Sequence, residues 1–224
     1  LLLIGFSTYY ITDRNSPEWV AVTTTPGQLK DVYLPDSTLI SMAGNSSIRY
    51  DARSYGKERR VVEMKGKAFF QVTRNEARPF SVYTERTEVT VLGTSFQINE
   101  QPEGTDVNVM TGKVSFGTTG NETDKVILTA GMSASYSMES KGITVVEEED
   151  LNTLSWKTRQ LRFNDTPLEK VIGDLNEYYQ VKVINKAENP NLKLTATFND
   201  LPLEDVLLVI NQTLDIRLAP EFPK

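Results

Sequence analysis

The chain contains no cysteine and no histidine among its 224 residues. These absences exclude disulfides, thiol nucleophiles, most zinc sites and the commonest general base of enzymes. Positive charge is also in deficit, because 24 Lys and Arg residues face 30 Asp and Glu residues, a net charge of −6. Such a chain lacks the broad basic surface that nucleic-acid binding needs, so we expect no nucleic-acid partner.

The apolar run at the start is too short to span a membrane. Residues 1–11 (LLLIGFSTYYI) are mostly apolar or aromatic, whereas a helix that crosses the hydrocarbon core needs about 20 such residues. We expect residues 1–18 to be the end of a transmembrane helix, with tyrosines at the interface, or a linker. An N-terminal core strand and the tail of a signal peptide remain open as alternatives.

The pattern of the sequence changes near residue 150, which predicts two domains, 19–150 and 151–224. Alternating strands broken by Gly, Pro, Asn and Asp precede this point, and helical periodicity follows it. The acidic residues 147–150 at the junction are expected to form a solvated linker or the first turn of a short helix. A basic run at 57–60 is expected to be a solvated hairpin tip.

The first domain is predicted to be all β. Many short strands at spacings of about 8–12 residues are typical of a solenoid-like, sandwich or barrel architecture, and the sequence leaves these three open. Gly66, Gly93, Gly112 and Gly131 each precede a strand by one or two residues. We expect glycine there because φ is positive or because two backbones approach closely. The predicted strands are 19–24, 29–34, 38–43, 46–50, 61–64, 67–73, 80–84, 88–92, 95–99, 107–110, 113–116, 126–128, 133–138 and 143–146.

The second domain contains an internal repeat. Residues 163–172 (FNDTPLEKVI) return 35 positions later as 198–207 (FNDLPLEDVL), with seven of ten positions identical. The repeat predicts a duplicated βαβ-βαβ unit, and hence a C-terminal α+β module. Each helix carries apolar residues at i, i+3, i+4 and i+7, which predicts one buried stripe. The stripes are Leu168, Val171, Ile172 and Leu175 in the first copy and Leu203, Val206, Leu207, Ile210 and Leu214 in the second.

Each copy also carries residues typical of a helix start. Thr166 is predicted to be the N-cap of the first helix, with Pro167 as its first residue and Glu169 completing a capping box. In the second copy Leu201 replaces the threonine, so either Asp200 caps that helix or the helix begins less firmly. Apolar alternation places strands at 161–163, 181–183, 192–198 and 216–218.

Four ordered segments closely resemble the periplasmic domain of FecR-type anti-sigma factors: 32–40 (VYLPDSTLI), 60–72 (RVVEMKGKAFFQV), 78–82 (RPFSV) and 91–98 (VLGTSFQI). Ser37 departs from the family, which usually has glycine there, so that turn is expected to differ. The second domain resembles the C-terminal domain of such proteins from Bacteroides and its relatives, at Trp156, Leu161, Phe163, Pro167, Leu168 and 178–181. That domain is similar to the secretin and TonB short N-terminal domain.

The resemblance implies a signalling protein rather than an enzyme, and it implies no cofactor. FecR-like proteins are anchored in the inner membrane and bind an extracytoplasmic-function (ECF) sigma factor through a cytoplasmic region that is absent here. Their periplasmic portion, to which this chain corresponds, receives a signal from the signalling domain of a TonB-dependent outer-membrane transporter. The resemblance therefore implies a periplasmic location for this chain and that transporter domain as its partner.

Strand edges in the second domain are the predicted docking site, because small sheets leave unpaired N–H and C=O groups that a partner strand can use. An alternative is that these strands pair only internally and the partner contacts the helix faces. Glu177, Lys182 and Arg217 are then expected to act as rim charges. The predicted partner-binding residues are Val181, Lys182, Val183, Ile184, Ile216, Arg217 and Leu218.

Two other functions remain as alternatives, a secreted glycan-binding module and a hydrolase. A hydrolase without histidine needs paired carboxylates, as in glycosidases. Asp165 and Asp200 occupy equal places in the repeat, which turn chemistry explains more simply. A glycan-binding module needs an exposed aromatic platform, although alternation predicts that most aromatic side chains face a core. The candidates for such a platform are Trp19, Tyr33, Tyr50, Tyr55, Phe69, Phe70 and Phe96.

Overall fold

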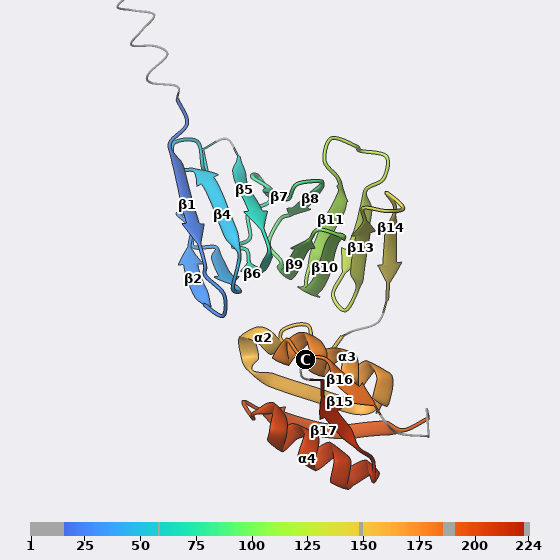
Figure 1. Ribbon diagram of the computed structural model, residues 1–224. Coiled ribbons are helices and arrows are strands. Elements are labelled where there is room, and N and C mark those ends of the chain that lie inside the picture. Colours follow the sequence, from blue (N-terminus) through green and yellow to red (C-terminus); the bar gives the residue numbers. More distant parts are fainter. Residues whose placement is uncertain (1–15, 58, 148–149, 186–190, 222–224) are drawn as a thin grey trace, which may run out of the picture. The chain divides into compact units, whose positions relative to one another are not determined.

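The computed structural model describes residues 16–57, 59–147, 150–185 and 191–221 (Figure 1). The chain divides into two compact units, residues 1–149 (the β unit) and residues 150–224 (the βα unit). The expected end of a transmembrane helix, residues 1–18, lies outside the described residues as far as residue 15. None of the helices in the described ranges is long and apolar enough to cross a membrane.

The β unit is a sandwich of two seven-stranded sheets. Neighbouring strands are antiparallel except for β5 and β7, which are parallel. In spatial order, the first sheet contains β1 (Trp19–Thr23), β4 (Ser47–Asp51), β5 (Arg60–Lys65), β7 (Phe80–Tyr83), β8 (Thr87–Val91), β11 (Lys113–Thr118) and β12 (Val126–Thr129). The second contains β14 (Ile143–Val146), β13 (Ser133–Ser137), β10 (Gly104–Thr111), β9 (Ser95–Gln101), β6 (Lys67–Gln71), β3 (Leu39–Met42) and β2 (Lys30–Tyr33).

The chain adds strands to both sheets in turn as it advances. Strand numbers rise steadily from β1 to β12 across one sheet and from β2 to β14 across the other, while the chain passes back and forth between them. Neither sheet closes on itself, so the barrel is excluded. The unit is an open sandwich whose chain advances as in a solenoid, and all strands predicted between residues 19 and 146 are present.

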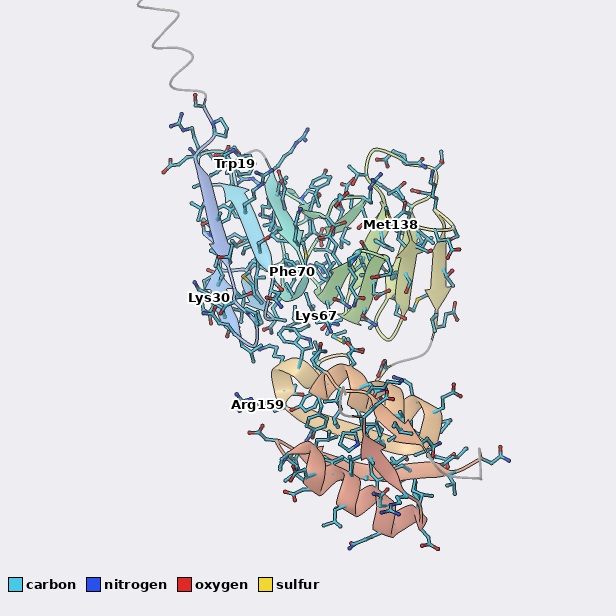
Figure 2. The ribbon with its side chains drawn as sticks, viewed as in Figure 1. Trp19, Lys30, Lys67, Phe70, Met138 and Arg159 are labelled. Atoms are coloured by element: carbon cyan, nitrogen blue, oxygen red, sulfur yellow. The ribbon has the colours of Figure 1, made fainter. Side chains whose placement is uncertain are left out.

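The core of the β unit lies between the two sheets. Strand alternation turns Val62 and Met64 of the first sheet inward. In the second sheet the ring of Phe70, labelled in Figure 2, stacks on that of Phe96 with 5.0 Å between centroids, and both side chains are fully buried. Burying an aromatic side chain of this size stabilises the fold by about 1.5–3 kcal/mol. Most of the aromatic residues considered as a glycan platform thus belong to the core.

Glycines stand where the chain turns from one sheet to the other. Gly66, between β5 and β6, has φ +84°, a conformation that L side chains rarely adopt. Gly93, between β8 and β9, lies close to another backbone instead, since a Cβ there would be 2.5 Å from the Cα of Arg74. Both expected reasons for glycine therefore occur at these corners.

Arg60 is buried in the β unit, which corrects the expectation of a solvated tip at this residue, whereas Lys57 and Arg59 are exposed. Its side chain is only 2% exposed and forms an ion pair with the Asp36 carboxylate at 3.0 Å. The guanidinium also donates to the carbonyls of Arg78 (2.7 Å), Thr73 (2.7 Å) and Asn75 (3.3 Å). These acceptors lie in the loop between β6 and β7, so one planar five-donor group fixes that loop. Charged residues alone do not show which backbone carbonyls will accept hydrogen bonds, so the sequence did not predict that Arg60 is buried.

The βα unit has the predicted order of two βαβ copies. Strand β15 pairs with β17 and β16 pairs with β18, both antiparallel, so each two-stranded sheet joins equivalent strands of the two copies. The core is formed by the predicted helix stripes together with strand residues such as Phe163 and Phe198. Its elements are α2 (Ser155–Thr158), β15 (Gln160–Pro167), α3 (Leu168–Tyr179), β16 (Val183–Asn185), β17 (Lys193–Asn199), α4 (Leu203–Leu214) and β18 (Leu218–Pro220).

The backbone repeats with the sequence. Asp165 and its counterpart Asp200 both have positive φ, at 50° and 47°. The residues that end the two helices, Gln180 and Asp215, are also 35 positions apart and have φ of 54° and 52°. The turn before each helix and the left-handed residue after it are therefore the same in both copies, as the repeat predicts.

The predicted capping box is absent. Helix α3 begins at Leu168, the capping position is taken by Pro167, and no side chain caps the helix. Thr166 instead pairs with Leu194 in the β15–β17 ladder, and its Oγ1 accepts the N–H of Asn164 at 3.0 Å. Strand pairing thus outcompetes the local capping preference. Asp200 does not cap α4 either, because no side chain caps that helix.

Candidate partner-binding surface

The predicted docking residues lie in one small sheet and in the two turns that lead into it. Strands β16 and β18 pair with each other, with Val183 opposite Pro220 and Ile184 opposite Ala219. The other predicted residues, 181–182 and 216–217, lie in the short turns that lead from each helix into its strand. Val183 is buried in the core, whereas Lys182 is exposed and forms an ion pair with Glu221 at 2.6 Å. The two strands pair with each other, and whether a partner adds a strand here or contacts the helix faces stays a prediction.

Asparagine side chains from the helices cover the outer edges of this sheet. Asn176 Oδ1 accepts the N–H of Val183 at 2.7 Å. Its counterpart Asn211 accepts the N–H of Leu218 at 2.7 Å and donates to the Leu218 carbonyl at 3.0 Å. Pro220, the next outward position of β18, has no N–H to offer. A partner strand would have to displace these bonds, so strand addition at β16 or β18 is costly.

A third asparagine covers the edge of β15. Asn152 Oδ1 accepts the N–H of Arg162 at 2.7 Å, and Nδ2 donates to the Arg162 carbonyl at 3.0 Å. The same Nδ2 donates to Asp174 on α3 at 2.7 Å. Asn152 is 8% exposed, so this amide is an internal part of the unit. One residue thereby joins the strand edge to the adjacent helix.

The edge of β17 has no comparable cover. Asp200 donates its N–H to the Arg159 carbonyl at 2.7 Å, which fixes the alternation of bonded and non-bonded pairs along β15 and β17. Arg162 and Thr197 face each other three positions on, as a non-bonded pair. The N–H and C=O of Thr197 consequently point away from β15. In the described ranges no other element donates to or accepts from them.

Helix α4 presents exposed apolar residues beside β17. Leu208 is 55% exposed and Val209 is 40% exposed. The counterparts of these residues in α3 are Gly173 and Asp174, so the apolar surface belongs to the second copy alone. Sequence periodicity does not single this surface out, because the inward stripe of α4 is apolar as well.

A charged cluster covers the corresponding face of α3. Lys170 forms ion pairs with Asp174 and with Asp150, the latter at 2.9 Å. Burial raises the pKa of the Asp174 carboxyl, and hydrogen bonds from Lys170 and Asn152 offset this only in part. Burial alone would lower the pKa of Lys170, but its bonds to the two carboxylates outweigh that effect and raise it. Lys170 therefore stays protonated near neutral pH.

Two tyrosines close α3 against the second copy. The rings of Tyr178 and Tyr179 meet edge to face at 4.7 Å, and the Tyr179 hydroxyl donates to the Leu201 carbonyl at 2.6 Å. Burial, with smaller contributions from Tyr178 and Asp200, raises the pKa of Tyr179 to about 12. As the pH rises above the ordinary tyrosine pKa of 10.0, the unfolded chain loses this proton before the folded chain does. Alkaline pH therefore favours unfolding.

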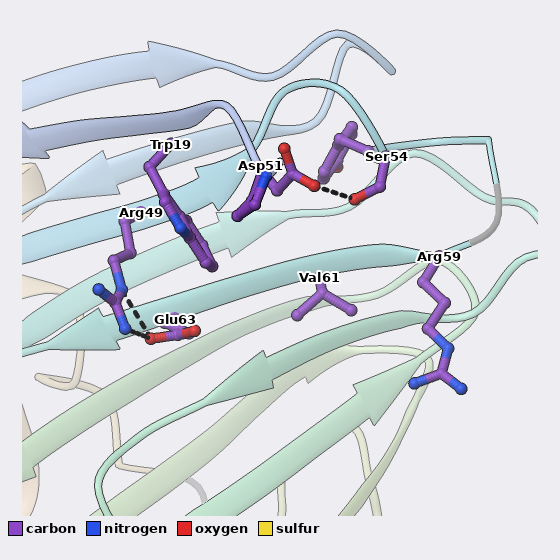
Figure 3. A pocket seen from close by; sticks show the side chains of 9 residues that line it. Trp19, Arg49, Asp51, Ser54, Arg59, Val61 and Glu63 are labelled. Carbon is purple, nitrogen blue, oxygen red and sulfur yellow. Dashed lines mark hydrogen bonds and ion pairs between the residues drawn. The ribbon is translucent and has the colours of Figure 1, made fainter. Parts of the chain in front are cut away.

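The β unit has a cavity of about 230 Å³ beside β1, β4 and β5 (Figure 3). Trp19 lines it and lies 4.7 Å from the Arg49 guanidinium, which is also paired with Glu63. The second carboxylate, Asp51, accepts a hydrogen bond from the Ser54 hydroxyl, and this bond lowers its pKa. The lowered pKa of Asp51 favours its ionised form, whereas a glycosidase also needs a protonated acid.

Most of the aromatic side chains considered as a sugar platform are not exposed. Among the seven considered as a sugar platform, Trp19 is 49% and Tyr33 is 71% exposed. They lie on β1 and β2, which belong to different sheets. Phe69, Phe70, Phe96 and Tyr55 are buried. The geometry therefore favours neither the hydrolase nor the glycan-binding alternative.

Comparison with known proteins matches both units. The family model of the FecR protein matches residues 20–115, and that of the FecR C-terminal domain matches residues 160–219. Two crystal structures, at 2.50 Å and 1.65 Å resolution, show a candidate anti-sigma factor from Parabacteroides distasonis ATCC 8503. Each is 27% identical, has a TM-score of 0.66, and aligns over 92% of this chain and 100% of its own. Among curated proteins no relative matches.

The two family models together cover more than half of the chain. They follow in the same order as the sandwich and the duplicated βα unit, and the crystal structures share both parts of the fold. This family acts in signalling by binding a sigma factor and is regulatory. The chain belongs to the FecR family of anti-sigma factors.

Proposed function

We propose that the chain is the periplasmic, signal-receiving part of an anti-sigma factor anchored in the inner membrane. In this role it receives a signal from the signalling domain of a TonB-dependent outer-membrane transporter and relays it to an ECF sigma factor on the cytoplasmic side. Membership of the FecR family carries the proposal. The docking task is assigned to the βα unit.

Three features of the βα unit support this assignment. Exposed apolar residues on α4 lie beside an uncovered strand edge, which is the surface that protein partners use in strand addition. Buried polar groups such as Asn152 and Asp174 are engaged in structural hydrogen bonds rather than aimed into a substrate cavity. The predicted residue Arg217 remains exposed, so it is available as a rim charge, whereas Lys182 is exposed but paired with Glu221.

Direct binding tests the proposed function. The complete chain of residues 1–224, immobilised by its N-terminus, is exposed to purified N-terminal signalling domains of TonB-dependent transporters from the same genome. We expect one domain to bind saturably, with a slower association rate at higher salt because rim charges steer the encounter. Saturable binding of a polysaccharide, with no response to any signalling domain, would contradict the proposal and favour a glycan-binding module.

A further inference from the structure

We propose that the outer edge of β17, together with the exposed face of α4, is where the partner docks, by adding an extended segment that carries apolar and basic side chains. This surface is formed by Thr197, Glu204, Asp205, Leu208 and Val209. The inference rests on the proposed function, since it takes the partner to be the transporter's signalling domain. It replaces β16 and β18, the strands that sequence reasoning selected.

The first copy of the repeat shows how such a surface is filled. Asn152 reaches the N–H and C=O of Arg162 on β15 and the carboxylate of Asp174 on α3 with a single amide group. The strand edge and the helix face therefore lie within reach of one small side chain. The segment before β15 supplies this group from within the chain.

The second copy presents the same geometry unfilled. The counterpart of Arg162 is Thr197, and the counterpart of Asp174 is Val209. Thr197 directs its N–H and C=O outward, and among the described residues no side chain bonds to them as Asn152 does to Arg162. Helix α4 therefore has an apolar residue, Val209, where α3 has the polar Asp174. A bound segment that offers backbone groups to Thr197 and an apolar side chain to Val209 satisfies both.

The remaining edges of the two small sheets are covered. Asn152 covers β15, Asn176 accepts the Val183 N–H of β16, and Asn211 covers β18. Unpaired strand edges invite pairing with another chain, and proteins usually blunt them. The βα unit blunts three edges with the same residue type and leaves the edge of β17 accessible in the part of the chain that the structure describes.

Charge on α4 indicates the character of the partner segment. Glu204 and Asp205 lie in the first turn of the helix and are exposed, and neither forms an ion pair with a described residue. The basic residues at the two ends of β17 are already engaged, Arg159 with Asp200 and Lys193 with Asp165. Lysine or arginine in the incoming segment complements the free carboxylates and adds to the apolar contact with Leu208 and Val209.

Paired substitutions at equal positions of the repeat test the inference. Leu208→Lys places a charge on the proposed surface, and Gly173→Lys places the same charge at the equivalent position of α3, where a Cβ meets no atom within 4 Å. We expect Leu208→Lys, and separately Val209→Lys, to weaken binding of the signalling domain by about tenfold or more, as loss of an apolar interface anchor does. Gly173→Lys is expected to change the dissociation constant less than about threefold.

Thr197→Pro tests strand addition itself. It removes the outward N–H while leaving the bonds between β15 and β17 in place, and proline is tolerated on edge strands. We expect a loss of binding comparable to that of Leu208→Lys, with the melting temperature of each variant confirming that the chain is folded. Leu208 and Val209 are exposed, so we expect both lysine variants to stay folded and any loss of binding to come from the surface itself.

The outcomes separate the two proposals. If Leu208→Lys and Val209→Lys bind the signalling domain as well as the unmodified chain does, and Arg217→Ala or Gly173→Lys loses binding, the β17 surface is overturned. The proposed function then still stands. Failure of every signalling domain to bind the unmodified chain overturns both. If the unmodified chain sediments as a dimer that Leu208→Lys converts to monomer, the occupant is a second copy, which also overturns this inference.

Discussion

Replacing Arg60 with methionine is expected to lower the free energy of unfolding of the β unit by about 3–5 kcal/mol. Methionine fills similar space but leaves the Asp36 carboxylate without its ion pair. It also leaves the carbonyls of Thr73 and Arg78 without their donor in the loop between β6 and β7. Removing one partner of a buried charge network costs far more than the net worth of the contact.

The measurement is urea unfolding followed by Trp19 fluorescence in a chain that carries Trp156→Phe, so that the signal reports the β unit. Arg86→Met is the matched control, because Arg86 is 56% exposed on its side chain and pairs with Glu85 on the surface. We expect the control to cost less than about 1 kcal/mol. Equal effects of the two substitutions would show that Arg60 does not organise the β6–β7 loop.

Replacing Asn152 with alanine is expected to destabilise the βα unit by about 2–3 kcal/mol. The substitution leaves the N–H and C=O of Arg162 without their side-chain partner and removes one hydrogen-bond donor from the buried Asp174 carboxylate. An unsatisfied buried polar group costs about 1–3 kcal/mol. The change also opens a second strand edge, so we expect the variant to self-associate more readily than the unmodified chain.

Thermal unfolding and sedimentation at several concentrations check both consequences. Asn164→Ala is a suitable control, since Asn164 is exposed and lies in β15, the strand whose edge Asn152 covers. A variant at Asn152 as stable and as monomeric as the control would contradict the role given to this amide. The inference about β17 would then lose its internal template.

Alternation and turn residues were sufficient to predict the strands of the β unit, because each strand buries one face in a single continuous core. The duplicated βα order was equally readable from the 35-residue repeat. The prediction that Thr166 caps the first helix was wrong, because pairing with Leu194 on a distant strand decided its conformation. The expectation for Arg60 was wrong for a similar reason, because its carbonyl acceptors lie in the β6–β7 loop, 13 to 18 residues further along the chain.

The proposed docking surface was only partly predictable. Sequence reasoning located the βα unit and the idea of an open edge, but it could not tell which edges are covered. Asn176 and Asn211 are 35 residues apart, so the repeat contained a signal for two of the covering residues. Asn152 lies outside the repeat, and the exposure of Thr197 depends on hydrogen-bond alternation across β15 and β17, which follows from register alone.

Amide hydrogen exchange of the full chain, measured free and with the bound signalling domain, tests the central claim most directly. The account predicts fast exchange at the Thr197 amide in the free chain, whereas the amides of Arg162, Val183 and Leu218 are protected. On binding, exchange should slow in residues 195–199 and 204–212 and stay unchanged in β16 and β18. Slowing confined to residues 181–185 and 216–220, or to the β unit, would contradict it.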